Sequence, residues 1–172
     1  MLNRARYCGI EWNSSVDGEG FRTVIFFSGC RHRCPGCHNP ETHDFSNGQI
    51  FDAKIQNEIS SYVRETNLIA GVTLSGGDPM YSAEAVIPFV EELKQTCPSK
   101  SVWIYSGFTY EEIIQDPLMK RLLSLCDVLV DGPFIEALRD ITLAFRGSSN
   151  QRIIDVQESL RTGNVVLYED EF

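Results

Sequence analysis

The stretch Thr23-Val-Ile-Phe-Phe-Ser-Gly-Cys-Arg-His-Arg-Cys-Pro-Gly-Cys37 decides the fold, because it joins an apolar run directly to three closely spaced cysteines. Residues 23–28 are mostly β-branched or aromatic, and they predict a buried strand. The cysteines therefore follow the end of a strand. In parallel α/β folds the carboxyl ends of the strands carry the chemistry, so we expect a functional site at this loop.

Apolar runs alternate with amphipathic stretches along the rest of the chain, which is typical of strands joined by crossover helices. Further strands are expected at residues 71–75, 102–106 and 128–131, and helices at residues 52–65 and 82–95. Helical crossovers place successive strands in parallel. Four such strands are too few to close an eight-stranded barrel, so the sequence predicts an α/β fold with an open, partial barrel of mainly parallel strands.

Local signals add two short helices and a less regular end of the chain. The capping box Thr109-Tyr-Glu-Glu112 predicts one helix start, and a second short helix is expected after Pro117. Towards the C-terminus, residues 151–156 and 165–168 favour strands and residues 158–161 favour a helical turn. No linker, repeat or low-complexity tract interrupts the sequence, so we expect one domain over residues 1–172.

Composition and charge argue against several classes of partner. The chain of 172 residues has 24 acidic and 15 basic residues, whereas nucleic-acid-binding proteins carry a basic footprint. No apolar run approaches the roughly 20 residues that cross a bilayer, and the first twenty residues lack the apolar region of a signal peptide. We therefore expect a cytoplasmic protein that binds neither nucleic acid nor membrane.

The three clustered cysteines indicate metal binding and not a disulfide framework, because such frameworks belong mainly to short secreted chains. Cys30, Cys34 and Cys37 have the spacing C-x3-C-x2-C, which lets one loop bind a metal cluster through three thiolates. Three protein ligands leave the fourth iron of a 4Fe-4S cubane open to a small chelating molecule, such as the methionyl end of S-adenosylmethionine.

A structural zinc site is the main alternative at this loop. Closed zinc sites often combine three cysteines with one histidine, and the fourth ligand would then be His32, His38 or His43. The spacing alone leaves both interpretations open. The other three cysteines are scattered, and no role is assigned to them: Cys8, Cys97 and Cys126.

A second motif, Ser75-Gly-Gly-Asp-Pro79, stands at the end of the strand expected at residues 71–75. Two glycines permit positive φ and a close approach of backbone to a ligand, so a backbone carbonyl or Asp78 could bind an ammonium group there. The same residue types are also common in plain turns. The position of the motif favours a function, because the glycines should face the cysteine loop across the same rim.

Together, the cysteine motif after one strand and the glycine-glycine-acid motif after the next resemble the radical S-adenosylmethionine superfamily. Five segments narrow the resemblance to the glycyl-radical activases of anaerobic ribonucleoside-triphosphate reductase: Val16-Asp-Gly-Glu-Gly-Phe-Arg22, Cys34-Pro-Gly-Cys-His-Asn-Pro-Glu41, Leu74-Ser-Gly-Gly-Asp-Pro79, Val130-Asp-Gly-Pro-Phe134 and Arg146-Gly-Ser-Ser-Asn-Gln151. The last segment distinguishes this subfamily from other glycyl-radical activases.

The resemblance implies an enzyme that uses a 4Fe-4S cluster and S-adenosylmethionine. A reduced cluster would cleave S-adenosylmethionine to methionine and a 5′-deoxyadenosyl radical, which would take a hydrogen from one glycine of the reductase. Cluster potentials span roughly −700 to +450 mV, and this cleavage needs the low end of that range. The resemblance therefore also implies an external one-electron reductant such as flavodoxin.

The resemblance carries over to individual residues of the two motifs. Cys30, Cys34 and Cys37 match the cluster ligands and would be catalytic through the cluster. Two further groups match the cofactor-binding backbone, one at the nucleoside end and one at the methionine amino group: Gly36, Cys37 and His38, then Gly76, Gly77 and Asp78.

Position alone adds two candidates for cofactor binding. Ser106 and Asp131 end two predicted strands on the same rim, where they could touch ribose, carboxylate or a cation. Arg146 and Asn150 resemble the subfamily signature but receive no catalytic role.

Two other functions remain open from the sequence. A radical S-adenosylmethionine enzyme acting on another protein or a small metabolite would share the cluster chemistry and form its product without the reductase. A non-catalytic zinc-binding module would be colourless and would contain about one zinc per chain.

Overall fold

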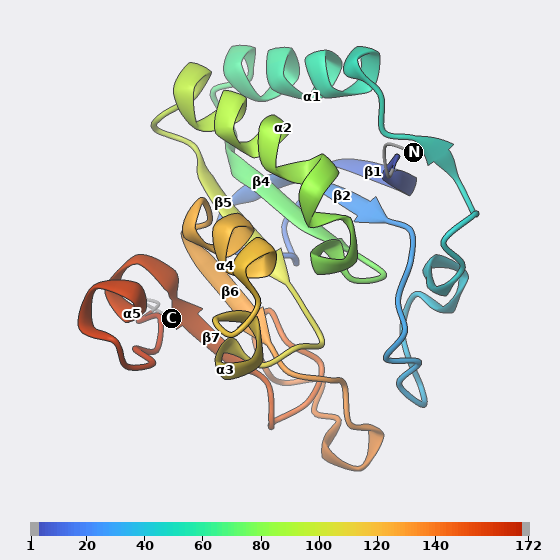
Figure 1. Cartoon of the computed structure of the whole chain (residues 1–172), viewed down its shortest axis with the longest axis vertical. Coiled ribbons are helices and arrows are strands. Elements are labelled where there is room, and N and C mark those ends of the chain that lie inside the picture. The colour runs from blue at the N-terminus through green and yellow to red at the C-terminus, as the bar shows by residue number, and fades with distance from the viewer. Residues whose placement is uncertain (1–3, 170–172) are drawn as a thin grey trace.

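The computed structural model describes residues 4–169 and contains one seven-stranded sheet with the strand order β3-β1-β2-β4-β5-β6-β7 (Figure 1). The strands are β1 Arg6–Ser14, β2 Phe21–Phe27, β3 Gln49–Ile50, β4 Ile69–Gly76, β5 Ser101–Tyr105, β6 Val128–Asp131 and β7 Arg152–Asp155. β2, β4, β5 and β6 pair in parallel, and the pairings outside this central group are antiparallel. The sheet is open, with β3 and β7 at its edges, so the prediction of an open, partial barrel is confirmed.

Helices cover one face of this sheet, where α1, α2 and α4 lie over the parallel strands (Figure 1). The α-helices are α1 Ala53–Glu65, α2 Ala83–Thr96, α3 Tyr110–Ile113, α4 Pro117–Ser124 and α5 Val156–Thr162. Three 3-10 helices accompany them: η1 Pro40–His43, η2 Pro79–Ser82 and η3 Glu136–Leu138. No helix of residues 4–169 is both long enough and apolar enough to span a membrane.

Side-chain caps explain where the predicted helices begin. Asp52 accepts a hydrogen bond from Ile55 N at the start of α1, so the helix predicted for residues 52–65 is confirmed with Asp52 as its cap. Both halves of the predicted capping box are present at α3, where the side chains of Thr109 and Glu112 each accept a backbone N–H of the other residue. The short helix predicted after Pro117 begins at Pro117 itself, where a missing N–H is harmless.

Residues alternate between the two faces of the parallel strands, as the pleat requires. On the helix-covered face, alternate residues such as Leu74 and Ile104 form the main core. On the opposite, inner face, Trp103 and Val130 belong to a second and smaller apolar cluster. The inner face is therefore the side on which a cavity can open.

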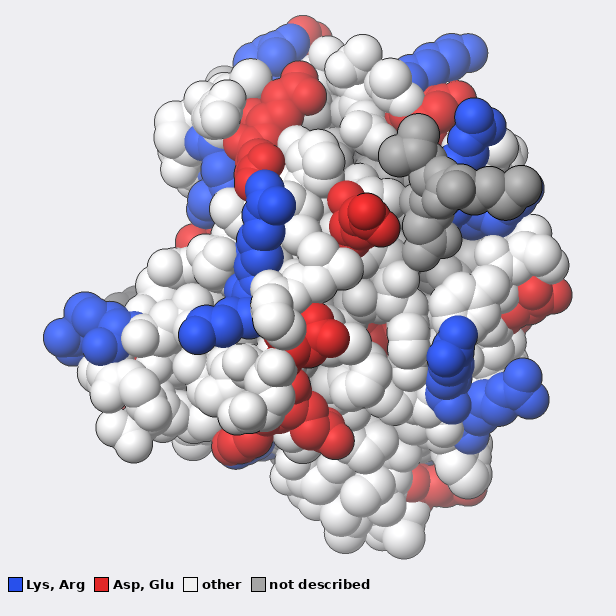
Figure 2. All heavy atoms as spheres, in the orientation of Figure 1, with Lys and Arg blue, Asp and Glu red and all other residues white. Residues whose placement is uncertain are grey.

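Figure 2 shows the helix-covered face, on which basic and acidic side chains are interspersed. Ion pairs link neighbouring elements on the surface, including Lys94 with Asp127 at 2.8 Å and Arg121 with Glu91 at 2.9 Å. Exposed pairs of this kind contribute only about 0–1 kcal/mol each to stability. The stability of the fold therefore rests mainly on its buried contacts.

Two predictions fail at the ends of the chain. The long strand β1 is missing from the sequence-based prediction, because it is mostly half-buried and carries no continuous apolar run. Residues 165–168 form no strand but only an isolated bridge between Ile154 and Leu167, after a left-handed turn at Gly163. The neighbouring β7 is confirmed, although it runs antiparallel to β6.

Arg22 is a fully buried cation on β2, and it ties three strands together at their amino-terminal ends. Its guanidinium donates five hydrogen bonds of 2.8–3.1 Å, to Thr73 Oγ1, Glu19 O, Ser101 Oγ, Val72 O and Ser101 O. Burial lowers the pKa of Arg22 to about 10, so the group is still protonated at neutral pH. A Cβ at Gly71 would lie 1.9 Å from Ser101 O and 2.7 Å from Arg22 Nη2, so glycine is needed there.

Replacing Arg22 with methionine should lower the free energy of unfolding by about 3 kcal/mol, because buried acceptors that lose their donors cost about 1–3 kcal/mol each. Arg121→Met is the matched control, since Arg121 is exposed and makes one surface ion pair. Urea unfolding followed by circular dichroism measures both variants. Equal effects of the two substitutions would contradict the stabilising role of Arg22.

Candidate active site

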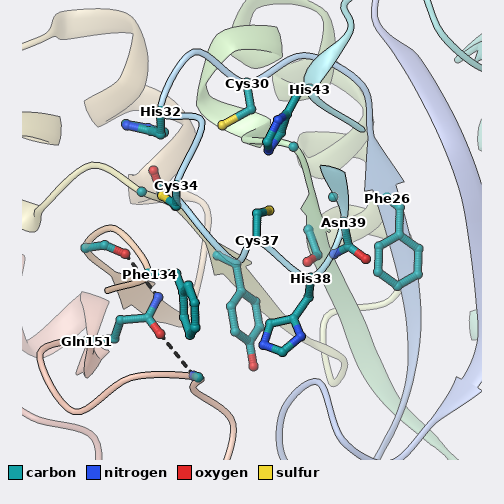
Figure 3. Close-up of a pocket in the computed structure, with 18 of the residues that line it drawn as sticks. Phe26, Cys30, His32, Cys34, Cys37, His38, Asn39, His43, Phe134 and Gln151 are labelled. Atoms are coloured by element: carbon teal, nitrogen blue, oxygen red, sulfur yellow. Dashed lines mark hydrogen bonds between the residues drawn. The ribbon is translucent and has the colours of Figure 1, made fainter. Parts of the chain in front are cut away.

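A cavity of about 410 Å³ opens at the carboxyl ends of the parallel strands (Figure 3). The cavity is lined on the inner face of the sheet by Phe26 of β2, Ser75 of β4 and Tyr105 of β5. All three cysteines of the C-x3-C-x2-C motif also line it, together with Gly76, Gly77, His38 and Ser106. The structure thus brings both sequence motifs into one cavity.

The segment of residues 28–39, called the cysteine loop here, is tied at its start to η1. Gly29 N donates to Thr42 O at 2.7 Å, and Cys30 N donates to His43 O at 3.2 Å. A tight turn follows, in which Cys37 N donates to Cys34 O at 3.1 Å. Burial raises the pKa of the Cys30 thiol, so metal binding as thiolate must release a proton from it.

The glycine motif lies directly against β2 and the cysteine loop, as its predicted position required. Gly77 N donates to Phe27 O at 2.8 Å, and Asp78 N donates to Gly29 O at 2.9 Å. Gly76 has φ +103°, and a Cβ at Gly77 would lie 2.6 Å from Gly29 O. Both positions therefore need glycine, and their backbone is brought to the edge of the cavity.

Asp78 is fully buried and does not itself line the cavity. Its Oδ1 accepts hydrogen bonds from Met80 N at 3.0 Å and Ser106 Oγ at 3.1 Å. Its Oδ2 accepts from Gly107 N at 2.9 Å and lies 2.9 Å from His32 Nε2. Both carboxylate oxygens are thus used within the protein, and the backbone of the glycine motif, not this side chain, faces the cavity.

His32 links the hydrogen-bond network of Asp78 to the cysteine loop. Its ring packs edge-on against Phe108, with ring centroids 4.5 Å apart. A Cβ at Gly107 would lie 2.5 Å from the His32 ring, so glycine is needed for the ring to fit. Asp78 and His32 together hold the cysteine loop against the ends of β4 and β5.

Two other predicted cofactor-binding residues also lie outside the cavity lining. Asp131 accepts hydrogen bonds from Tyr110 N at 2.8 Å and from Arg152 Nε and Nη2 at 3.0 and 2.5 Å. Asp131 has the same strand parity as Leu129, so it points to the helix-covered face and stabilises the junction of β6, β7 and α3. Gly36 instead packs near Phe134, where a Cβ would lie 3.3 Å from the ring.

Residues 132–151, called the wall segment here, close one side of the cavity. The Gln151 side chain accepts a hydrogen bond from Gly147 N at 3.0 Å and donates one to Gly132 O at 3.1 Å (Figure 3). It also accepts a hydrogen bond from Ser148 N at 3.2 Å. Phe134 of this segment contacts the His38 ring edge-on, with centroids 5.4 Å apart. The wall segment is therefore folded onto itself and packed against the cysteine loop.

The two residues singled out in the C-terminal signature are structural in this segment. Arg146 donates a hydrogen bond to the carbonyl of Gln151, and Asn150 Nδ2 donates to Pro133 O at 2.8 Å. Neither residue lines the cavity.

Several cavity residues were missed by the sequence analysis: Asp17, Phe26, Asn39, Tyr105, Phe134, Gly147 and Gln151. A signal existed for Phe26 and Tyr105, because they are the inward positions of two correctly predicted strands. Phe134 and Gln151 belong to quoted motifs, but no periodicity indicates which of their side chains reach the cavity.

The donor set fits a multinuclear cluster better than a single zinc ion. Within residues 4–169, no three side chains of His, Cys, Asp or Glu converge closely enough to hold one metal ion, whereas zinc needs four donors at one point. His32 was one of the three candidates for the fourth zinc ligand, and its Nε2 is hydrogen-bonded to Asp78. A cubane binds each thiolate at a different iron, so its ligands stand apart, and thiolates are the ligands that iron–sulfur clusters use.

An unpaired buried nitrogen also indicates space for a group in the cavity. His43 Nε2 is buried and has no hydrogen-bond partner among the described residues, although His43 lines the same cavity as the cysteines. A buried polar atom without a partner points to a missing ligand or water.

Comparisons with known proteins agree with this geometry. A family model described as a 4Fe-4S single cluster domain matches residues 16–154. The chain is 40% identical over 141 residues to the anaerobic ribonucleoside-triphosphate reductase-activating protein of Haemophilus influenzae, covering 80% of this chain and 90% of that protein. The proteins of the same name from Escherichia coli K12 and Enterobacteria phage T4 are 36% and 37% identical, each over about 80% of this chain and 89% and 86% of their own lengths.

Substitution of Gly77 by alanine should strongly reduce iron binding, because the new Cβ would lie 2.6 Å from Gly29 O and push the cysteine loop away from β4. Gly9→Ala is the matched control, since no atom lies within 4 Å of a Cβ there. Iron and sulfide analysis after anaerobic reconstitution measures the effect. Full iron binding by Gly77→Ala would contradict the tight packing described for this motif.

Substitution of Asp78 by asparagine should lower the free energy of unfolding by about 2 kcal/mol, because an amide nitrogen would face hydrogen-bond donors in a buried site. Asp140→Asn is the control, because Asp140 likewise accepts the backbone N–H two residues ahead but lies at the surface, and it should change stability little. Thermal unfolding of the two apo-proteins tests this. A stability of Asp78→Asn equal to that of the control would show that the buried carboxylate is not needed.

Proposed function

Because this chain belongs to the family of anaerobic ribonucleoside-triphosphate reductase-activating proteins, we propose that Cys30, Cys34 and Cys37 are the ligands of its 4Fe-4S cluster. The protein is a radical S-adenosylmethionine enzyme that generates a glycyl radical on the reductase. When reduced, the bound cluster supplies the electron that cleaves S-adenosylmethionine to methionine and a 5′-deoxyadenosyl radical, which takes a hydrogen from a glycine of the reductase.

One observation supports the ligand assignment most directly. The three thiols and the backbone of Gly76 and Gly77 line the same cavity at the carboxyl ends of adjacent parallel strands. Three cysteine ligands leave one iron free for the amino and carboxylate groups of S-adenosylmethionine. The cysteine loop therefore has to hold three ligands and leave the side facing β4 clear.

We further propose that the backbone of residues 75–77 binds the methionine amino group. Carbonyl oxygens at this strand end can accept hydrogen bonds from an ammonium group, and the glycines allow it to approach closely. Asp78 acts as a positioning residue beneath them, because its hydrogen bonds to Ser106 and His32 fix the glycine motif relative to the cysteine loop.

The nucleoside end of the cofactor is proposed to lie against the wall segment. His38 and Phe134 present ring surfaces to the cavity, and Gln151 keeps the wall in place. This arrangement would shield a reactive radical on one side. The reductase glycine would enter where the cavity is open to solvent.

An external one-electron reductant such as flavodoxin and a cytoplasmic location complete the proposal. All six cysteines are free thiols in the structure, which suits a reducing compartment. A low-potential cluster also needs protection from oxygen, which agrees with an anaerobic reductase as its partner.

Substitution of Cys34 by alanine should abolish the activity, because the cluster would lose one of three ligands. We expect 5′-deoxyadenosine formation under dithionite to fall at least about 100-fold, beyond the 10–100-fold typical of an outer-shell change. The iron content of the variant would fall as well, and so would the electron paramagnetic resonance signal of the glycyl radical on the reductase.

Cys8→Ser is the matched control for this experiment. Cys8 lies outside the cavity lining, and its sulfur is 3.1 Å from Ser28 Oγ, a contact that a serine hydroxyl can keep. Wild-type iron content and cleavage in Cys34→Ala would contradict the ligand assignment. Loss of the glycyl radical signal alone, with cleavage intact, would instead question the protein substrate.

A further inference from the structure

Two buried side-chain atoms of the described residues have no hydrogen-bond partner, His43 Nε2 and Asn150 Oδ1. A buried polar atom without a partner is unfavourable, so each such atom needs an explanation, such as a bound water or ion. Asn150 is not among the residues that line the cavity, but His43 is. Of these two residues, His43 is therefore the one that borders the cavity.

The backbone around His43 is held against the cysteine loop. The His43 carbonyl accepts a hydrogen bond from Cys30 N, which pairs these two residues directly. The preceding residue, Thr42, is buried, and its hydroxyl and its carbonyl bond to Asn39 O and Gly29 N. Figure 3 shows the His43 ring beside Cys30 and directed towards the space that the three thiols border. His43 is thus held next to the proposed cluster ligands.

The other two histidines of the cavity have different surroundings. His32 Nε2 is engaged by Asp78, and the His38 ring packs against Phe134. His43 alone of the three has a buried ring nitrogen that no described residue satisfies. An imidazole N–H is a good donor, and the sulfur atoms of an iron–sulfur cluster are acceptors whose hydrogen bonds set its reduction potential.

We propose that His43 Nε2–H donates a hydrogen bond to a sulfur atom of the bound cluster and raises the reduction potential of the cluster. This proposal rests on the assignment of Cys30, Cys34 and Cys37 as ligands. The reduced cluster carries one more negative charge than the oxidised cluster, and part of this charge lies on sulfur. A donor at this position therefore stabilises the reduced form more than the oxidised form.

His43 is a positioning residue in this role, because it acts on S-adenosylmethionine only through the cluster. Hydrogen bonds to charged acceptors are roughly twice as strong as those between neutral groups, so the donor should shift the equilibrium between the two cluster forms about tenfold. Loss of the donor should reduce the ratio of reduced to oxidised cluster about tenfold at a fixed potential, equivalent to about 59 mV for one electron.

Redox titration of reconstituted holoprotein, without S-adenosylmethionine, tests the proposal. The proteins are wild type, His43→Phe and His43→Gln, each first analysed for iron and sulfide. Phenylalanine keeps a ring of similar size without a donor, whereas the glutamine amide can place an N–H close to the position of Nε2. We expect the reduced fraction, measured by electron paramagnetic resonance, to fall about tenfold in His43→Phe and to recover in His43→Gln.

Asn150→Ala is the matched control, because it removes the other unpaired buried side-chain atom, which lies outside the cavity lining. Its titration curve should overlay that of the wild type. Pulsed resonance on wild type labelled with ¹⁵N-histidine gives a second measurement, which does not depend on whether a variant folds. A weak nitrogen coupling that comes from His43 would agree with a hydrogen bond to sulfur.

Three results would overturn the proposal. The first is equal titration curves for wild type and His43→Phe at equal iron content. The second is a reduced fraction in His43→Gln that stays as low as in His43→Phe. The third is a strong nitrogen coupling, which would mean that His43 binds iron directly. Failure of the wild type itself to assemble a four-iron cluster would refute the ligand assignment, and with it this role for His43.

Discussion

The buried carboxylate of Asp78 is the interaction on which the site depends. A carboxylate removed from water is stable only when its oxygens accept hydrogen bonds, and Asp78 has four donor groups from three separate segments. These donors are the first turn of η2, the end of β5 and the His32 ring of the cysteine loop. The shared carboxylate holds these three segments in one arrangement. The cavity is therefore positioned by a group that does not line it.

Much of the fold follows from local signals in the sequence. β4, β5, β6, α1 and α2 were predictable because their apolar periodicity and caps agree, and the cysteine spacing placed the site at a strand end. The direction of the side chains at the rim was harder to predict. Asp131 lies two residues after Leu129, which faces the helices, so the two-residue period alone would have turned Asp131 away from the cavity.

Other parts of the site could not be read from periodicity. The wall segment is held by side-chain to backbone bonds of Gln151, which have no repeat in the sequence. His43 was considered only as a zinc ligand, and its unpaired nitrogen is visible only when the cavity is formed. Long-range contacts of this kind depend on the complete fold, and motif spacing does not contain them.

The order of these parts along the chain has a consequence for how the enzyme matures. The three cysteines are translated early, whereas the wall segment that closes one side of their cavity emerges roughly a hundred residues later, which takes on the order of 5–20 s on the ribosome. During that interval the three cysteines have been synthesised, but one side of their cavity has not. The cavity around the three thiols is therefore complete only after the wall segment has been synthesised and packed against the cysteine loop.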